Sequence, residues 1–119
     1  MAASPHLARF TTLCLERDDI GDAGAAALAA SPHAANLTDL NLRGNGIGDA
    51  GAAALASSSH LARLRRLQLT DNPVGDAGAL ALAASPFLAS LNELWIFCCR
   101  IGGEGKRALQ ERFGDRVHT

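Results

Sequence analysis

Aromatic residues and an excess of charge of either sign are both lacking in this sequence of 119 residues. Aromatic side chains make up only 4% of it, so a core has to be filled by leucine and alanine, which requires close packing of backbone elements. The 11 Lys and Arg residues stand against 12 Asp and Glu residues, and the formal net charge is −1. A nearly neutral chain has no field that would attract nucleic acid or a membrane surface, so we expect neither as a partner.

Cysteine is too scarce to hold the chain together through a disulfide framework. The sequence contains only Cys14, Cys98 and Cys99, and an odd number of free thiols fits a reducing compartment better than secretion. No apolar run approaches the roughly 20 residues that a membrane helix needs. Residues 1–6 lack the charged and apolar regions of a signal peptide. We therefore expect a cytoplasmic protein.

What the sequence does contain is one unit repeated four times. Ile47–Ala56 reads Ile-Gly-Asp-Ala-Gly-Ala-Ala-Ala-Leu-Ala, and related stretches begin at Ile20, Val74 and Ile101, each 27 residues after the last. A fixed period of this length indicates a solenoid. We predict a single domain over residues 1–119, with repeats at about 10–36, 37–63, 64–90 and 91–112 and a C-terminal cap at 113–119.

The first half of each unit has the pattern of a strand that ends in a turn. In the second unit, Leu40 and Leu42 have the two-residue spacing of a strand with one apolar face. Asn45 follows at a position where a side chain can bond the turning backbone. In the fourth unit this position holds Cys99, which we expect to be a small buried turn residue.

The second half of each unit is rich in alanine and is typical of a helix. An aspartate stands at each helix start, where its carboxylate suits the N-cap and the positive end of the helix dipole; these are Asp22, Asp49 and Asp76. A glycine recurs inside each helix, as at Gly51, although glycine costs roughly 1 kcal/mol there. Its recurrence indicates that the missing Cβ lets the helix lie close to the sheet.

The whole unit, Leu-x-x-Leu-x-Leu-x-x-Asn-x-Ile-Gly-Asp-Ala-Gly, resembles the ribonuclease-inhibitor-like class of leucine-rich repeats over residues 7 to about 112. The resemblance implies an α/β fold, a right-handed αβ solenoid or leucine-rich-repeat arc. In this fold a parallel sheet forms the concave face and helices form the convex face. The period is slightly shorter than is usual for the class, and four repeats make a short arc. The resemblance implies a binding surface and carries no catalytic residues.

The two ends of the chain differ. Ala2–His6 repeats the pattern of Ala29–His33, so the chain begins in the middle of a repeat, and the sequence leaves open whether it is a fragment with repeats missing upstream. At the other end, Gly114 is typical of a left-handed helix C-cap, and Phe113 and Val117 can cover the open core. We therefore expect a finished C-terminus.

Outward positions on neighbouring strands form three rows, with about 4.8 Å between adjacent members of a row. The first row is Thr12, Asp39, Arg66 and Glu93, the second is Cys14, Asn41, Gln68 and Trp95, and the third is Glu16, Arg43, Thr70 and Phe97. Opposite charges adjoin in the first and third rows. Such pairs, each worth less than about 1 kcal/mol, either only relieve repulsion between strands or belong to a polar concave surface that binds a partner.

Trp95 and Phe97 stand at outward positions where the other repeats carry polar or small residues. Tryptophan is enriched in the energetically dominant residues of protein interfaces, which favours contact with a partner. Equally, the C-terminal tail can fold over both rings as part of a cap. The residues alone do not decide between these interpretations.

No set of residues predicts catalysis, a cofactor or a metal. His6, His33 and His60 recur at the repeat period, which indicates duplication, and no zinc-type ligand spacing accompanies Cys98 and Cys99. The glycine-rich helix starts resemble phosphate-binding loops, but an aspartate already occupies each of them. We therefore predict a protein that is not an enzyme.

The leading prediction is a non-catalytic scaffold that binds a protein partner through the concave sheet. The predicted contacts are Asp39, Asn41, Arg43, Arg66, Gln68, Thr70, Glu93, Trp95 and Phe97.

The alternative is a structural fragment that dimerises through an uncapped N-terminal edge. There the strand at Thr12–Glu16 is unpaired and Leu7, Phe10 and Leu13 are thinly covered. A regulator of a GTPase or a ligase is a distant third. Near-identical repeats fit a designed chain, but a single lysine and leftover cysteines favour a natural, bacterial, recently duplicated sequence.

Overall fold

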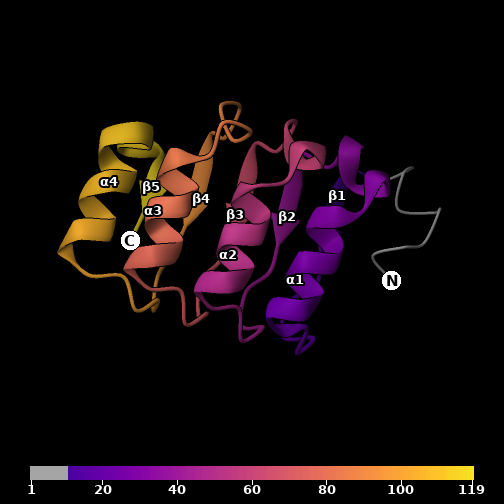
Figure 1. The fold of residues 1–119 in the computed structure, drawn as a ribbon, viewed down its shortest axis with the longest axis horizontal. Helices are drawn as coiled ribbons and strands as arrows, with labels where there is room; N and C mark the ends of the chain where they lie inside the picture. Colours follow the sequence, from indigo (N-terminus) through magenta and orange to yellow (C-terminus); the bar gives the residue numbers. More distant parts are fainter. Residues whose placement is uncertain (1–10) are drawn as a thin grey trace.

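The computed structural model describes residues 11–119, and within them strands and helices alternate along the molecule (Figure 1). The helices lie side by side on one face of the sheet. In chain order the elements are β1 (Thr12–Cys14), α1 (Gly21–Ala30), η2 (Pro32–Asn36), β2 (Asp39–Asn41), α2 (Asp49–Ala56), η3 (Ser59–Leu61), β3 (Arg66–Gln68), α3 (Asp76–Ala84), β4 (Glu93–Trp95), α4 (Gly103–Phe113), η4 (Gly114–Arg116) and β5 (Val117–His118).

The sheet is parallel, with the strand order β1-β2-β3-β4-β5. Equivalent residues of successive repeats are paired in register, so that Leu40 lies beside Leu67 and Leu67 beside Leu94. The predicted fold class, an α/β solenoid arc, is confirmed. The strand β5 was not predicted, and it pairs with β4 at the end of the sheet.

Leucines from both halves of each repeat fill the space between the sheet and the helices. On the strand side Leu40, Leu67 and Leu94 are buried. On the helix side the corresponding residues are Leu28, Leu55, Leu82 and Leu109. Small alanines between them, among them Ala52 and Ala79, let neighbouring helices pack closely. Phe113 is the only aromatic residue in the buried core of residues 11–119.

The asparagine that follows each strand ties two repeats together. The main-chain N–H of Asp18 donates to Asn45 Oδ1 at 2.9 Å, and Asn45 Nδ2 donates to the carbonyl oxygen of Leu15 at 2.8 Å and of Leu42 at 3.0 Å. Asn72 has the same role one repeat later. These bonds confirm that the side chain satisfies the turning backbone, and they do so across the repeat boundary.

Cys99 takes the asparagine position in the fourth repeat. Its Sγ lies 3.2 Å from the carbonyl oxygen of Leu69, the same kind of acceptor that the asparagines use. Desolvation by burial raises the pKa of the Cys99 thiol. The thiol therefore stays protonated and can donate to that carbonyl. The residue is half-buried, less covered than predicted.

Each aspartate of the Gly-Asp-Ala-Gly stretch caps the helix of the next repeat. The main-chain N–H groups of Gly75 and Gly78 donate to Asp49 Oδ1 at 2.7 and 2.9 Å. Asp22 and Asp76 accept the equivalent bonds from α2 and α4. The prediction that each aspartate caps its own helix was wrong. Since α2 already begins at Asp49, the carboxylate projects sideways to the neighbouring helix instead.

The recurring glycine makes room for that carboxylate. A Cβ on Gly51 would lie 2.6 Å from Asp22 Oδ1 and 3.3 Å from the Cβ of Ala25 in the preceding helix. Gly78 and Gly105 have the same surroundings one and two repeats later. The close approach that requires glycine is therefore to the preceding helix and to the residue that leads into the same helix, such as Ile47, whose Cγ2 would lie 2.7 Å from a Cβ on Gly51; the prediction had placed it between helix and sheet.

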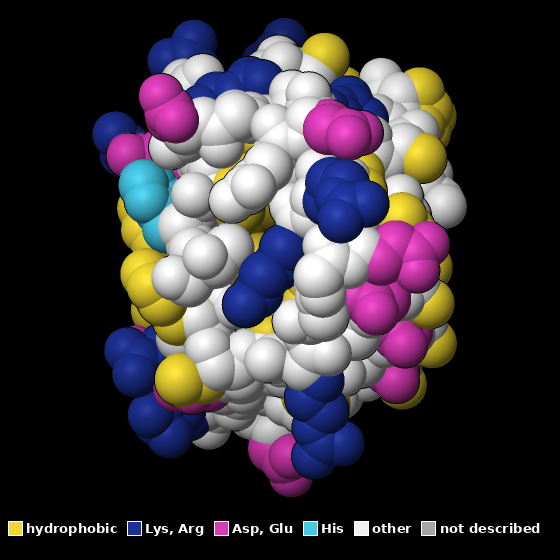
Figure 2. Space-filling model, turned by 90° about the vertical axis from the view of Figure 1, so that its left-hand side faces the viewer, with side chains coloured by type: hydrophobic (Ala, Val, Ile, Leu, Met, Phe, Trp, Pro, Cys, Tyr) yellow, Lys and Arg dark blue, Asp and Glu magenta, His cyan; other side chains and the backbone are white. Residues whose placement is uncertain are grey.

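The C-terminal end of the solenoid is covered. Phe113 is 3% exposed and Val117 packs against the core, as predicted. Gly114 has a positive φ of 58° but a ψ of −130°, so it turns the chain without adopting the predicted left-handed helical cap. Figure 2 looks onto this end and shows charged side chains spread across it. No helix within residues 11–119 is long and apolar enough to cross a membrane.

Candidate binding surface

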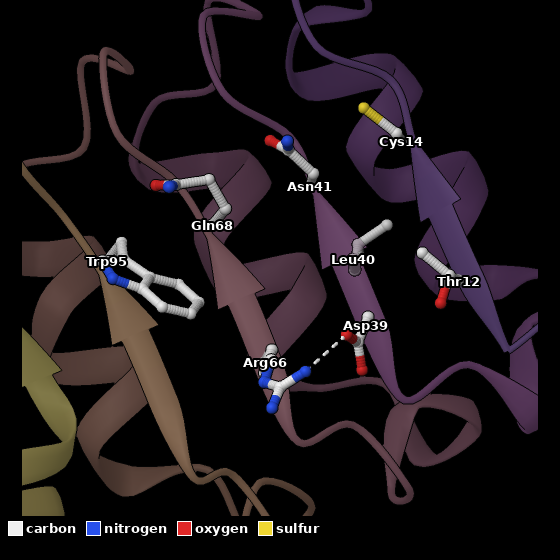
Figure 3. Close-up of a pocket in the computed structure, with 8 residues that line it drawn as sticks. All are labelled: Thr12, Cys14, Asp39, Leu40, Asn41, Arg66, Gln68 and Trp95. Carbon is white, nitrogen blue, oxygen red and sulfur yellow. Dashed lines mark hydrogen bonds and ion pairs between the residues drawn. The ribbon is translucent and has the colours of Figure 1, made fainter.

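The open face of the sheet, opposite the helices, carries the predicted rows of side chains. Figure 3 shows Thr12, Asp39 and Arg66 of the first row and Cys14, Asn41, Gln68 and Trp95 of the second. The strand register places Asp39 beside Arg66 and Arg66 beside Glu93 in the first row. It also places Asn41 beside Gln68 and Gln68 beside Trp95 in the second row. The third row lies just beyond the strands, where the main-chain bonds between repeats continue.

Arg66 joins two carboxylates in the first row. Its Nη1 lies 3.2 Å from Asp39 Oδ2, and its Nε lies 3.2 Å from Glu93 Oε2. All three side chains are partly exposed, so each pair contributes less than about 1 kcal/mol to stability. The pairs hold the guanidinium across three strands, and one negative charge remains in excess.

Arg43, in the third row, also contacts two carboxylates. Its Nε lies 3.1 Å from Asp71 Oδ2 and 3.8 Å from Glu16 Oε1. Arg17 Nη2 is 3.8 Å from the same Asp71 carboxylate. The contact between Glu16 and Arg43 was predicted from the row, but the shorter contact with Asp71 was not.

Asp71 was missed because it lies on the turn after β3, one position beyond the row. There its φ is +62°, and Arg17, Gly44 and Cys98 have similar positive values at the same position of the other repeats. Gly44, which tolerates that conformation, was the available signal in the sequence. A turn of this shape sends the side chain of Asp71 toward Arg43.

Thr70 was predicted to be an exposed contact, and this was wrong. The residue is 6% exposed, and its hydroxyl finds no hydrogen-bond partner within the part of the chain that is described. Its main chain lies between the adjacent repeats, since the N–H of Gly44 donates to the carbonyl oxygen of Thr70 and the N–H of Asp71 donates to that of Phe97. Thr70 therefore contributes shape to the open face and no direct contact.

The second row contains a shallow hollow of about 260 Å³. Its lining comprises Thr12, Cys14, Asp39, Leu40, Asn41, Arg66, Gln68 and Trp95 (Figure 3). The indole of Trp95 projects toward β3 and forms one wall. The lining thus combines an aromatic ring with side chains that can form hydrogen bonds.

The C-terminal tail reaches Trp95. His118 on β5 stacks on the indole, with ring centroids 5.4 Å apart and an angle of 20° between the rings. Trp95 is half-buried, whereas Phe97 is 45% exposed and is one of two large hydrophobic residues exposed among residues 11–119. The tail therefore supports one face of Trp95 and leaves Phe97 open.

Among the described residues, no group of three or more His, Cys, Asp or Glu side chains could hold a metal ion. Cys14, Cys98 and Cys99 are free thiols. His6, Leu7 and Phe10, together with the repeated Ala2–His6 stretch, lie outside the described residues.

Two segments of the chain, residues 33–56 and 60–83, match the family model described as Leucine Rich repeat. Each segment runs from a loop through a strand, β2 or β3, to the following helix. Together with the parallel ladder of strands, these matches show that the chain belongs to the leucine-rich repeat proteins. Such repeats are commonly protein-interaction modules and generally have no catalytic activity. No curated protein matches the chain.

Proposed function

We propose that the protein binds a protein partner through the open face of its sheet. The observation that carries this proposal is the pair of aromatic side chains, Trp95 and Phe97, beside a hollow on that face. Buried aromatic anchors dominate the energy of most protein interfaces. The proposed contacts are Asp39, Asn41, Arg43, Arg66, Gln68, Glu93, Trp95 and Phe97.

Differences between repeats support the choice of face. Helices α1 to α3 repeat alanine and glycine almost without change, and these residues are used for packing between neighbours. The open face changes from repeat to repeat and becomes aromatic at β4. Within α1 to α3 the exception is Leu80, 39% exposed, where α1 and α2 carry alanine, and α4 carries charged residues such as Lys106 and Arg107. Leu80 is thus the matched control for the aromatic residues.

The test is affinity capture from an extract of the source cells, read out by quantitative mass spectrometry. We expect a partner that is retained by the wild-type chain and by Leu80→Ala and lost by the double variant Arg66→Ala, Trp95→Ala. Phe97→Ala, which removes a more exposed ring, should also weaken capture and separates loss of contact from loss of stability. A partner that the double variant retains would contradict the proposal.

A second candidate is self-association through β1. This strand is at the edge of the sheet, and Thr12 and Cys14 on it are exposed. An exposed edge strand presents unpaired main-chain groups to another chain. Light scattering should then show a mass that rises with protein concentration, and a monomer at the highest concentration would rule this out.

We further infer that the repeats are of the ribonuclease-inhibitor-like class and that the protein works in the cytoplasm. Support for the class comes from the full helices, of 8 to 11 residues, in every repeat. Support for the compartment comes from three free thiols. Alkylation of the protein inside cells should modify the two exposed thiols, Cys14 and Cys98, and a disulfide found there would contradict the assignment.

A further inference from the structure

We propose that the side-chain amides of Asn41 and Gln68 donate hydrogen bonds to uncharged acceptors, the main-chain carbonyl oxygens of an extended partner segment. This segment crosses β2 and β3 and places one apolar side chain in the hollow beside Trp95. The inference rests on the proposed binding face and adds the chemistry of the partner.

The orientation of both amides follows from the backbone next to them. The main-chain N–H of Arg43 donates to Asn41 Oδ1 at 3.1 Å, and that of Thr70 donates to Gln68 Oε1 at 3.0 Å. A main-chain N–H can only donate, so the oxygen of each amide has to face it. The NH₂ group of each side chain is therefore turned away from the backbone.

The two NH₂ groups belong to equivalent residues of adjacent strands and are available for hydrogen bonds to a partner. Asn41 and Gln68 are register partners on adjacent parallel strands, about 4.8 Å apart, and each accepts the N–H two residues further on. Within residues 11–119 neither NH₂ group has a hydrogen-bond partner. Both side chains line the hollow. A partner that covers them has to supply acceptors, because a buried donor without one is costly.

The charges on either side favour uncharged acceptors. Arg66 is already paired with Asp39 and Glu93 on one side of the row. On the other side, Arg43 is paired with Asp71 and Glu16, and Arg17 with Asp71. Three arginines thus face four carboxylates. Among the residues that line the hollow, Arg66 is the only cation and it is already paired, so a partner carboxylate would meet no unpaired cation there, whereas a carbonyl oxygen needs none.

The small size and the openness of the hollow fit a side chain of a bound segment. Sites for drug-sized ligands have volumes of about 300–1,000 Å³ and enclose most of the ligand. The hollow is smaller, at about 260 Å³, and lies open on the sheet face. The largest apolar group in its lining is the indole of Trp95, which His118 holds in place. One aliphatic or aromatic side chain next to the bonded carbonyls fits this site.

The test uses random 12-residue peptides displayed on yeast and selected on the full chain. Binding of the enriched peptides, as synthetic peptides with capped ends, is then measured by titration calorimetry. The decisive variant is Asn41→Asp, Gln68→Glu. It keeps the oxygens that accept from Arg43 and Thr70 but replaces both outward NH₂ groups by acceptors. Leu80→Ala is the control that leaves the open face unchanged.

We expect enriched peptides with one apolar anchor and no net charge. Their affinity should fall about 10- to 30-fold in Asn41→Asp, Gln68→Glu at unchanged melting temperature, which is the loss of two hydrogen bonds. Leu80→Ala should leave it unchanged. Because the acceptors are uncharged, raising the salt from 50 to 500 mM should change the wild-type affinity by less than about threefold.

Three results would overturn the inference. The first is unchanged affinity in Asn41→Asp, Gln68→Glu while Trp95→Ala abolishes binding, in which case the proposed face stands and only the amide donors fail. The second is a set of acidic peptides whose binding collapses at high salt. The third is a selection that enriches no peptide. Affinity that none of the open-face variants changes would overturn the proposed function as well.

Discussion

Single residues in this chain act mainly across repeat boundaries. Asn45 bonds the main chain of the preceding repeat, and Asp49 caps the helix of the following one. Solenoid repeats contact only their nearest neighbours, so these bonds are the places where stability is shared along the chain. The same residue types would be ordinary turn and cap residues in an isolated repeat.

A prediction at this scale concerns Asp49. Asp49→Ala removes the acceptor of Gly75 and Gly78, so we expect the free energy of unfolding to fall by about 1 kcal/mol, the usual effect of losing a helix cap. Asp49→Asn keeps a side-chain oxygen and should cost less than half of that. Urea denaturation of both variants measures the difference. An equal loss in the two variants would show that charge, and not the hydrogen bonds, matters.

Among the elements, the short tail strand β5 sets the shape of the binding surface. It pairs with β4, brings His118 onto Trp95, and takes the edge at which a further strand would otherwise pair. Arg116 fixes its approach by donating to the carbonyl oxygens of Phe113 at 2.8 Å, Leu91 at 2.9 Å and Arg112 at 3.0 Å. The C-terminal tail that covers the end of the core therefore also forms part of the candidate binding surface.

A prediction at the scale of the element is that His118→Ala exposes Trp95. The chain has a single tryptophan, so its fluorescence reports this contact alone. We expect a red shift of the emission and a larger Stern–Volmer constant with iodide. The free energy of unfolding should fall by about 0.5–1.5 kcal/mol, the size of an aromatic pair. His33→Ala, at a turn remote from β5, is the control and should leave the emission unchanged.

For the molecule as a whole, the stacking of repeats makes stability most sensitive to core substitutions at the centre. Leu67 on β3 is fully buried between the second and the fourth repeat, whereas Leu13 on the edge strand β1 is only partly buried. Interfaces with neighbours supply much of the stability of a solenoid. Damage in the middle therefore weakens both halves.

We expect Leu67→Ala to lower the free energy of unfolding by about 2–5 kcal/mol. Leu13→Ala, the same substitution at the equivalent position of the first repeat, should cost less than half as much. Chemical denaturation followed by circular dichroism compares them directly. Equal losses would contradict the dominance of the repeat interfaces.

The sequence by itself determined the period, the strand and helix of each repeat, the inward leucines such as Leu40 and the rows to which Asp39, Arg66 and Glu93 belong. These features are local and periodic, and parallel strands in register repeat them at a constant spacing. Tertiary structure decided which helix Asp49 caps, that Asp71 reaches Arg43, that Thr70 is buried and that β5 holds Trp95. Each of these depends on how neighbouring repeats or the tail approach from the side, and the sequence pattern does not show which neighbouring group a side chain reaches.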